Sequence, residues 1–192
     1  MRPYDFLLAG VGGQGTLLAS TILAEVGLRA GYDVKRSEVH GMAQRGGSVS
    51  SHVRWGDVVR SPLIATGSAD ILVAFELCEA LRYLEFLRPG GTALVSDHVI
   101  VPVTVTAGSA TYPSQEQVLA RLNTVAAEVK LVPGMAAAEA LCNPRVHNVV
   151  LLGALSRLIP VDTGIWQQVI EGNVPQRTVE LNQAAFARGR SL

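Results

Sequence analysis

The sequence predicts one α/β domain in which a mostly parallel sheet lies between two layers of helices and the C-terminal end is helical. A short, continuous apolar run at 71–75 is typical of a strand buried on both faces, and residues 92–96 are expected to form another buried strand. A helical stretch at 78–87 lies between them, and this order of strand, helix and strand implies parallel strands joined by a right-handed crossover. No repeat, low-complexity tract or linker interrupts residues 1–192, so we expect a single domain.

The N-terminal half opens with a strand at Tyr4–Ala9 and a helix at Thr16–Ala30, which Gly31 is placed to end. A second strand is expected at Asp33–Val39. The alternation of Val49, Val53 and Trp55 on one face predicts a third strand at Ser48–Trp55. A loop at 61–70 then leads to the buried strands.

The C-terminal half becomes progressively helical. Residues 99–106 alternate valine with other residues but contain Pro102, so they form either an edge strand or a segment that leaves the sheet. Capping patterns predict the helices: Ser114 with Gln117 is a capping box, Asn143-Pro144 is a cap with a first-turn proline, and Asp162 is an N-cap. The remaining expected elements are helices at 114–127, 143–159, 162–171 and 175–188 and a strand at 129–132.

Composition excludes several classes of function. The formal net charge is zero, with 16 basic and 16 acidic residues, so nothing favours binding to nucleic acid or to an anionic membrane. No apolar run approaches the roughly 18 residues of a membrane span, and the N-terminus lacks the features of a signal peptide, so we expect a cytoplasmic protein. Only 17% of residues are charged. Either a partner covers part of the surface or the sheet is buried on both faces.

Two cysteines, Cys78 and Cys142, stand far apart in apolar, helical contexts. They form neither a C-x-x-C pair nor a cluster, which argues against zinc or iron–sulfur ligation by this chain. We expect two buried, reduced thiols.

The first candidate site is the glycine turn Gly10-Val11-Gly12-Gly13-Gln14-Gly15, which joins the first strand to the first helix. Gly10, Gly12 and Gly15 fit the spacing G-x-G-x-x-G of Rossmann-like folds: a tight turn, a close approach to the backbone, and close packing of the helix. The helix start presents unpaired N–H groups and a positive dipole end, which suit a phosphate or carboxylate. Alternatively, the glycines only shape the turn.

The turn does not by itself predict NAD binding. A dinucleotide-binding site typically has an acidic residue at the end of the second strand. Glu38 is near that place, but Lys35 and Arg36 precede it, so the pattern is ambiguous and we expect poor binding of NAD.

The second candidate site is the loop at 40–47, where we single out His40, Gln44, Arg45, Gly46 and Gly47. Glycine beside Arg45 lets a backbone come close to whatever the arginine binds, and a guanidinium pairs with phosphate or carboxylate through a fork of donors. A plain hairpin needs only two to five residues, so the longer loop favours a binding role over a simple polar turn.

The remaining polar residues favour structural interpretations. Glu76 and Asp97 end predicted strands, where they are expected to satisfy backbone N–H groups. His52, His98 and His147 are isolated in sequence and are expected to be ordinary surface or core histidines. Nothing resembles a Ser-His-Asp arrangement.

The two candidate sites together resemble the gamma-type domain of the 2-oxoacid:ferredoxin oxidoreductase family, and within it the small subunits of the two-subunit indolepyruvate enzymes. The resemblance spans nearly the whole chain. Besides 10–15 and 38–47, it includes Ser48–Arg54, Ser61–Ile64, Ala69–Glu76, Asn143-Pro144, Asn148–Ala154 and Val179–Asn182.

The resemblance implies a reaction that this chain cannot run alone. In such enzymes thiamine diphosphate attacks the keto carbon of a 2-oxo acid, carbon dioxide leaves, electrons pass singly through iron–sulfur clusters to ferredoxin, and coenzyme A takes the acyl group. This sequence lacks the G-D-G…N-N pattern of thiamine diphosphate sites and the cluster cysteines. The resemblance therefore implies a large partner subunit that carries thiamine diphosphate with magnesium and the clusters.

Within such a complex, the glycine turn and the Arg45 loop could hold a phosphate-bearing group, for which coenzyme A is the preferred candidate, or could simply shape the subunit interface. Two other functions stay open: a free-standing Rossmann-like nucleotide-binding protein, and a gamma subunit of the pyruvate or 2-oxoglutarate type. The sequence does not identify the 2-oxo acid or the stoichiometry, since the partner is expected to contact the substrate's side chain.

Overall fold

The structure is a computed structural model that describes residues 2–40 and 46–192, with only the backbone described at His40. Within these residues a six-stranded sheet has the order β2-β3-β1-β4-β5-β6. The strands are β1 (Tyr4–Val11), β2 (Asp33–His40), β3 (Ser48–Gly56), β4 (Ala69–Ala74), β5 (Leu87–Ser96) and β6 (Glu128–Val132).

The sheet is mostly parallel, as predicted, but it has an antiparallel part. Strands β1, β4, β5 and β6 are paired in parallel, whereas β3 is antiparallel to both β1 and β2. The hairpin partner β3 therefore lies between β1 and β2. Because β1 and β3 run in opposite directions, Val11 pairs with Ser48, and the glycine turn lies beside the start of β3.

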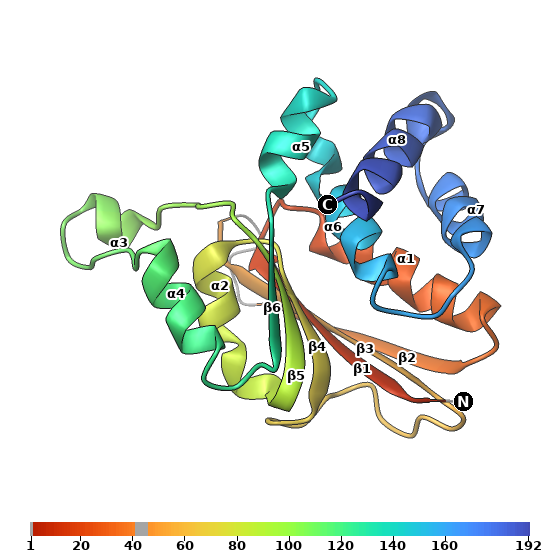
Figure 1. Ribbon diagram of the computed structural model, residues 1–192, viewed down its shortest axis with the longest axis horizontal. Helices are drawn as coiled ribbons and strands as arrows, with labels where there is room; N and C mark the ends of the chain where they lie inside the picture. The colour runs from red at the N-terminus through yellow and green to blue at the C-terminus, as the bar shows by residue number, and fades with distance from the viewer. Residues whose placement is uncertain (1, 41–45) are drawn as a thin grey trace.

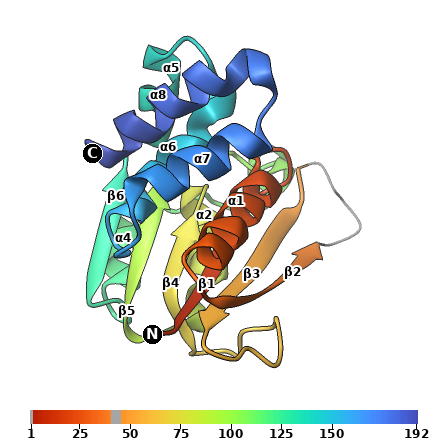
Figure 2. The ribbon, with the colours of Figure 1, turned by 90° about the vertical axis from the view of Figure 1, so that its right-hand side faces the viewer.

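Helices cover both faces of the sheet, which confirms the three-layer arrangement (Figures 1 and 2). One face carries α1 (Thr16–Arg29), α6 (His147–Ser156), α7 (Thr163–Asn173) and α8 (Val179–Arg190); the other carries α2 (Leu77–Arg82) and α4 (Gln115–Leu122). Each layer closes its own apolar core against the sheet. The shorter helices are α3 (Val103–Thr106), α5 (Gly134–Ala140) and the 3-10 turns Leu84–Phe86, Pro144–Val146 and Gln176–Thr178.

Three predicted boundaries were wrong. The helix expected at 78–87 ends at Arg82, and β5 begins at Leu87, so Pro89 lies inside a strand. Proline is tolerated there because the pairing of β4 with β5 shifts register between Ala69 and Ile71. The helix expected at 114–127 ends at Leu122.

One further helix was not predicted, and one segment for which two interpretations were open is now assigned. Helix α5 was not predicted at all, although its alanines are strong helix formers. Residues 99–106 leave the sheet, which was one of the two interpretations, and Val103–Thr106 form a single helical turn. The described residues contain no helix that is long and apolar enough to cross a membrane.

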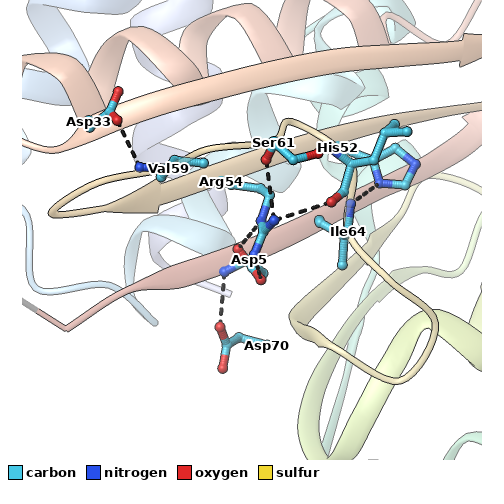
Figure 3. Close-up of polar contacts among 9 residues, drawn as sticks. Asp5, Asp33, His52, Arg54, Val59, Ser61, Ile64 and Asp70 are labelled. Carbon is cyan, nitrogen blue, oxygen red and sulfur yellow. Dashed lines mark hydrogen bonds and ion pairs between the residues drawn. The ribbon is translucent and has the colours of Figure 1, made fainter.

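Arg54 fastens the loop that follows β3 to the start of β1 (Figure 3). Its Nε and Nη2 donate to the two carboxylate oxygens of Asp5 at 2.8 and 2.9 Å, and its Nη1 donates to the carbonyls of Ser61 and Leu63. The backbone N–H of Asp5 in turn donates to Asp70. This fork of contacts gives the Ser48–Arg54 and Ser61–Ile64 stretches a structural role.

Candidate functional site

The glycine turn leaves an open face at the start of α1. Gly13 (φ 108°) and Gly15 (φ 78°) both adopt the left-handed backbone conformation that favours glycine. A Cβ added at Gly13 would meet no atom of the described residues within 4 Å, so among these residues Gly13 borders open space. Gly15 is the N-cap of α1 and offers no side-chain cap, which leaves the first-turn N–H groups without that partner.

Two of the glycines are needed for packing. A Cβ at Gly10 would lie 2.8 Å from the Thr16 side chain and 3.1 Å from that of Phe75. At Gly15 it would lie 2.5 Å from the side-chain nitrogen of Asn148, which donates to the Gly15 carbonyl at 3.2 Å. The third glycine of the motif thus permits contact with α6, in addition to closing the turn.

Gln14 has a structural role in the turn, while its place among the candidate binding residues stays a prediction. Its Oε1 accepts from the Val11 N–H at 2.7 Å, and its Nε2 donates to the Phe75 carbonyl at 2.8 Å. Both ends of the amide are therefore occupied in tying the turn to the end of β4.

The structure brings the two candidate sites together. The Gly12 N–H donates to the Gly47 carbonyl at 2.8 Å, and the Gly46 N–H donates to the Gly12 carbonyl at 3.2 Å. Gly46 has a φ of 71°, so glycine is favoured there. Gln44 and Arg45 lie outside the described residues, as does the side chain of His40, and their proposed contacts stay a prediction.

A cleft of about 540 Å³ opens beside the turn. One wall is formed by the turn and the start of α1, including Gly13 and Leu17, and the other by β2 and β3, including Glu38, Val39 and Ser50. Leu17 and Val39 are about half exposed, at 54% and 48%. The cleft thus combines backbone N–H donors with an apolar mouth, a combination that suits a ligand with both a phosphate and an apolar part.

Glu38 is not placed as the acidic residue of a dinucleotide site. In that fold the acid follows the strand next to β1, whereas β3 occupies this position here. Glu38 also pairs with Arg36 at 2.9 Å, and Arg36 is held by Thr21 of α1 at 2.7 Å. The strand order therefore does not support a ribose-binding role for Glu38, and weak binding of NAD stays a prediction.

Glu76 is confirmed as a helix cap. It is buried, and its Oε2 accepts from the Glu79 N–H at 2.9 Å at the start of α2. Its Oε1 accepts from the Ile100 N–H at 3.0 Å and from the Tyr112 hydroxyl. Asp97 is half-buried, and burial raises its pKa, while a hydrogen bond from the Gly134 N–H acts in the opposite direction.

Two histidines that are distant in sequence meet at the end of β5, which the sequence analysis missed. The rings of His98 and His147 lie 5.5 Å apart, and His147 Nε2 is 2.8 Å from the Ser96 hydroxyl. Burial, followed by the neighbouring His98, lowers the pKa of His147 to about 4. His147 is therefore a neutral core histidine at neutral pH, as is typical of an imidazole used for packing. His52 is likewise buried, and burial lowers its pKa.

The cysteines differ from the prediction of two buried thiols. Cys142 is exposed at the end of α5 with a φ of 57°, and Cys78 is only partly buried, which raises its pKa. Both are free. Among the residues that the structure describes, no group of three His, Cys, Asp or Glu side chains could hold a metal ion.

The fold of this chain is that of subunits of 2-oxoacid:ferredoxin oxidoreductases whose structures have been solved. The crystal structure of the gamma subunit of a keto/oxoacid ferredoxin oxidoreductase from Geobacter sulfurreducens matches with a TM-score of 0.72 and 26% identity, covering 98% of this chain and 96% of that one. A 2-oxoglutarate:ferredoxin oxidoreductase from Magnetococcus marinus, solved with 2-oxoglutarate, coenzyme A and succinyl-CoA bound, shares the fold: its TM-score is 0.74 at 20% identity, over 100% of this chain and 31% of that one.

The chain belongs to the pyruvate ferredoxin/flavodoxin oxidoreductase family, whose sequence model matches residues 5–192. Indolepyruvate oxidoreductase subunit IorB from Pyrococcus horikoshii is 40% identical to it over 193 residues, which is 98% of this chain and 95% of the relative. These matches confirm the resemblance seen in the sequence and identify the chain as a subunit of a 2-oxoacid:ferredoxin oxidoreductase.

Proposed function

We propose that this chain is the small subunit of an indolepyruvate-type 2-oxoacid:ferredoxin oxidoreductase, formed by one gamma-type domain over residues 1–192. The observation that carries the proposal is the 40% identity to an indolepyruvate oxidoreductase subunit of nearly the same length. The lower identity of 30% to the 2-oxoglutarate synthase subunit KorC from Methanothermobacter thermautotrophicus supports the 2-oxoglutarate alternative less well.

In this proposal a large subunit supplies thiamine diphosphate with magnesium and the iron–sulfur clusters, and ferredoxin accepts the electrons. Two cysteines far apart in the sequence do not suit a cluster site in this chain. The complex oxidatively decarboxylates the 2-oxo acid and transfers the acyl group to coenzyme A. A cytoplasmic location follows from the use of ferredoxin and coenzyme A.

We propose that the glycine turn holds a phosphate group of coenzyme A at the subunit boundary. The open space at Gly13, the uncapped N–H groups of α1 and the backbone pairing of Gly12 with Gly46 and Gly47 support this role. Arg45 would add a fork of donors to the phosphate. The half-exposed Leu17 and Val39 would contact the apolar part of the ligand. When bound, coenzyme A supplies the thiol that accepts the acyl group.

The test is an anaerobic assay of the chain reconstituted with its large subunit against indolepyruvate, phenylpyruvate, pyruvate and 2-oxoglutarate. We expect coenzyme A-dependent ferredoxin reduction with the aryl substrates, and none by the small chain alone with thiamine diphosphate added. Preference for pyruvate or 2-oxoglutarate would contradict the proposed specificity. Activity of the isolated chain would contradict the division of roles, and micromolar NAD affinity, on the order of −8 kcal/mol, would favour a free-standing nucleotide-binding protein.

A further inference from the structure

An uncharged segment projects from the body of the molecule after β5. Residues 99–111, which we call the valine arm, contain no Asp, Glu, Lys, Arg or His. The arm runs outward to α3, which lies beyond α4 at the left of Figure 1. Its side chains Val99, Val101 and Val103 are 44%, 53% and 83% exposed, so valines that alternate as in a strand face solvent.

The root of the valine arm is fixed. The buried carboxylate of Glu76 accepts from the Ile100 N–H at 3.0 Å and from the hydroxyl of Tyr112, so one side chain holds the segment where it leaves and where it returns. The Leu77 N–H also donates to the His98 carbonyl at 2.9 Å. A projecting segment with an anchored root is pre-organised for binding, which lowers the entropy lost when a partner orders it.

The composition of the valine arm fits a protein interface. Grouped exposed apolar side chains mark interaction sites, whereas scattered ones need no explanation. The cores of interfaces are also depleted of charge. The arm combines both features.

We propose that the valine arm docks into an apolar groove of the large subunit of the oxidoreductase. The inference rests on the proposed function, because the large subunit is the partner which that function requires. The position of the arm favours this partner over a second copy of the chain. Glu76 follows Phe75, whose carbonyl accepts from Gln14 of the glycine turn at 2.8 Å. The arm and the glycine turn therefore share the carboxyl edge of the sheet, and a subunit that closes the cofactor site there also reaches the arm.

The test compares the double variant Val101→Asp/Val103→Asp with the control Val58→Asp in the full-length chain. Val58 is also highly exposed, at 72%, but it follows β3 at the opposite edge of the sheet. We expect the double variant to bind the large subunit at least about tenfold more weakly and the control to bind within about twofold of wild type. Thermal unfolding of the isolated chains should be unchanged by either substitution. Hydrogen exchange should show new protection of residues 99–111 in the wild-type complex.

The outcomes separate the two proposals. If the wild-type chain does not bind the large subunit, the proposed function itself fails. If it binds and the double variant binds equally well, or if residues 99–111 gain no protection, only the docking role is overturned. Equal weakening by the control would also overturn it, since the effect would then be one of added charge. Sedimentation showing a wild-type dimer that the double variant disrupts would assign the arm to a second copy instead.

Discussion

The backbone N–H of Gly12 donates a hydrogen bond to the carbonyl of Gly47 at 2.8 Å. This contact joins the turn after β1 to the residue before β3, so the two glycine-rich motifs form one continuous backbone surface. Because β3 pairs directly with β1, the contact also extends the ladder of the sheet by one step into the turn. A ligand at the start of α1 would therefore meet both motifs at once.

Replacing Gln14 by leucine should destabilise the fold. The substitution removes the partners of the Val11 N–H and the Phe75 carbonyl, and each unsatisfied group costs about 1–3 kcal/mol when buried. Urea unfolding of the isolated chain should show the loss. Gln168→Leu, on the exposed face of α7, is the control and should change stability by less than about 0.5 kcal/mol. Equal stability of the Gln14 variant would favour ligand contact as the role of this side chain.

Local features were predictable from the sequence. The glycine spacing, the capping box of Ser114 with Gln117, and the cap at Glu76 depend on residues close in the chain, and all three are present. The placement of β3 between β1 and β2 was not predictable, because strand order depends on long-range pairing that periodicity does not encode.

The candidate site was only partly predictable for the same reason. Gln14 was included as a member of the glycine turn, but its amide donates to the carbonyl of Phe75, which is distant in sequence. The pairing of His98 with His147 joins β5 to α6, and no local signal marks it. Their positions after a predicted strand end and after an Asn-Pro cap were the available hints.

Replacing Arg54 by lysine should weaken the structure while leaving ligand and partner binding intact. Lysine keeps the positive charge but cannot donate to both carboxylate oxygens of Asp5 at once. It also lacks the additional N–H donor that contacts the carbonyls of Ser61 and Leu63. Since Arg54 and Asp5 are partly buried, we expect a loss of about 1–3 kcal/mol in the free energy of unfolding. The matched control is Arg60→Lys on the exposed loop, with little expected change. A stable Arg54 variant with impaired assembly would show that the arginine serves the interface.

Two glycine-to-alanine substitutions should have opposite effects on stability. A Cβ at Gly189 of α8 would lie 1.9 Å from the Val150 carbonyl oxygen of α6, so alanine must separate the two helices. We expect a loss of about 1–3 kcal/mol or more. At Gly172 of α7 a Cβ would meet no atom within 4 Å, and alanine should stabilise the helix by about 0.5–1 kcal/mol. Thermal melts of the two variants side by side test the close packing of α6 and α8; a neutral Gly189 variant would disprove it.

Stability should fall as the pH falls below about 6.5, in part through His147. Its folded pKa of about 4 lies below the unfolded value of 6.5, so between these values the unfolded chain binds more protons than the folded one. Its contribution between pH 7 and pH 5 is about 2 kcal/mol. In urea unfolding at the two pH values, His147→Gln should show a smaller loss than wild type by about that amount. If wild type and His147→Gln lose the same unfolding free energy between pH 7 and pH 5, the folded protein accommodates the charged imidazole. His52→Gln is a second comparison, since the pKa of His52 is also lowered by burial.

Replacing Leu17 by glutamate should separate anion binding from folding. Leu17 lies in the first turn of α1, is 54% exposed and lines the cleft, and this turn contains no acidic residue. A carboxylate there interacts favourably with the helix dipole and stabilises the fold by about 0.3–1 kcal/mol, so the melting temperature should stay the same or rise. The same charge should repel a phosphate bound at the glycine turn. Leu17→Gln is the matched control, because it removes the same apolar contact without adding charge.

Calorimetric titration of coenzyme A into the reconstituted complex gives the comparison. We expect the glutamate variant to bind about tenfold more weakly than the glutamine variant at low salt, which corresponds to roughly 1.4 kcal/mol. Because the repulsion is between charges near solvent, the difference in coenzyme A affinity between the two variants should decrease as ionic strength rises. Equal affinities at low salt would place the phosphates away from the start of α1 and leave the glycine turn with a structural role at the interface.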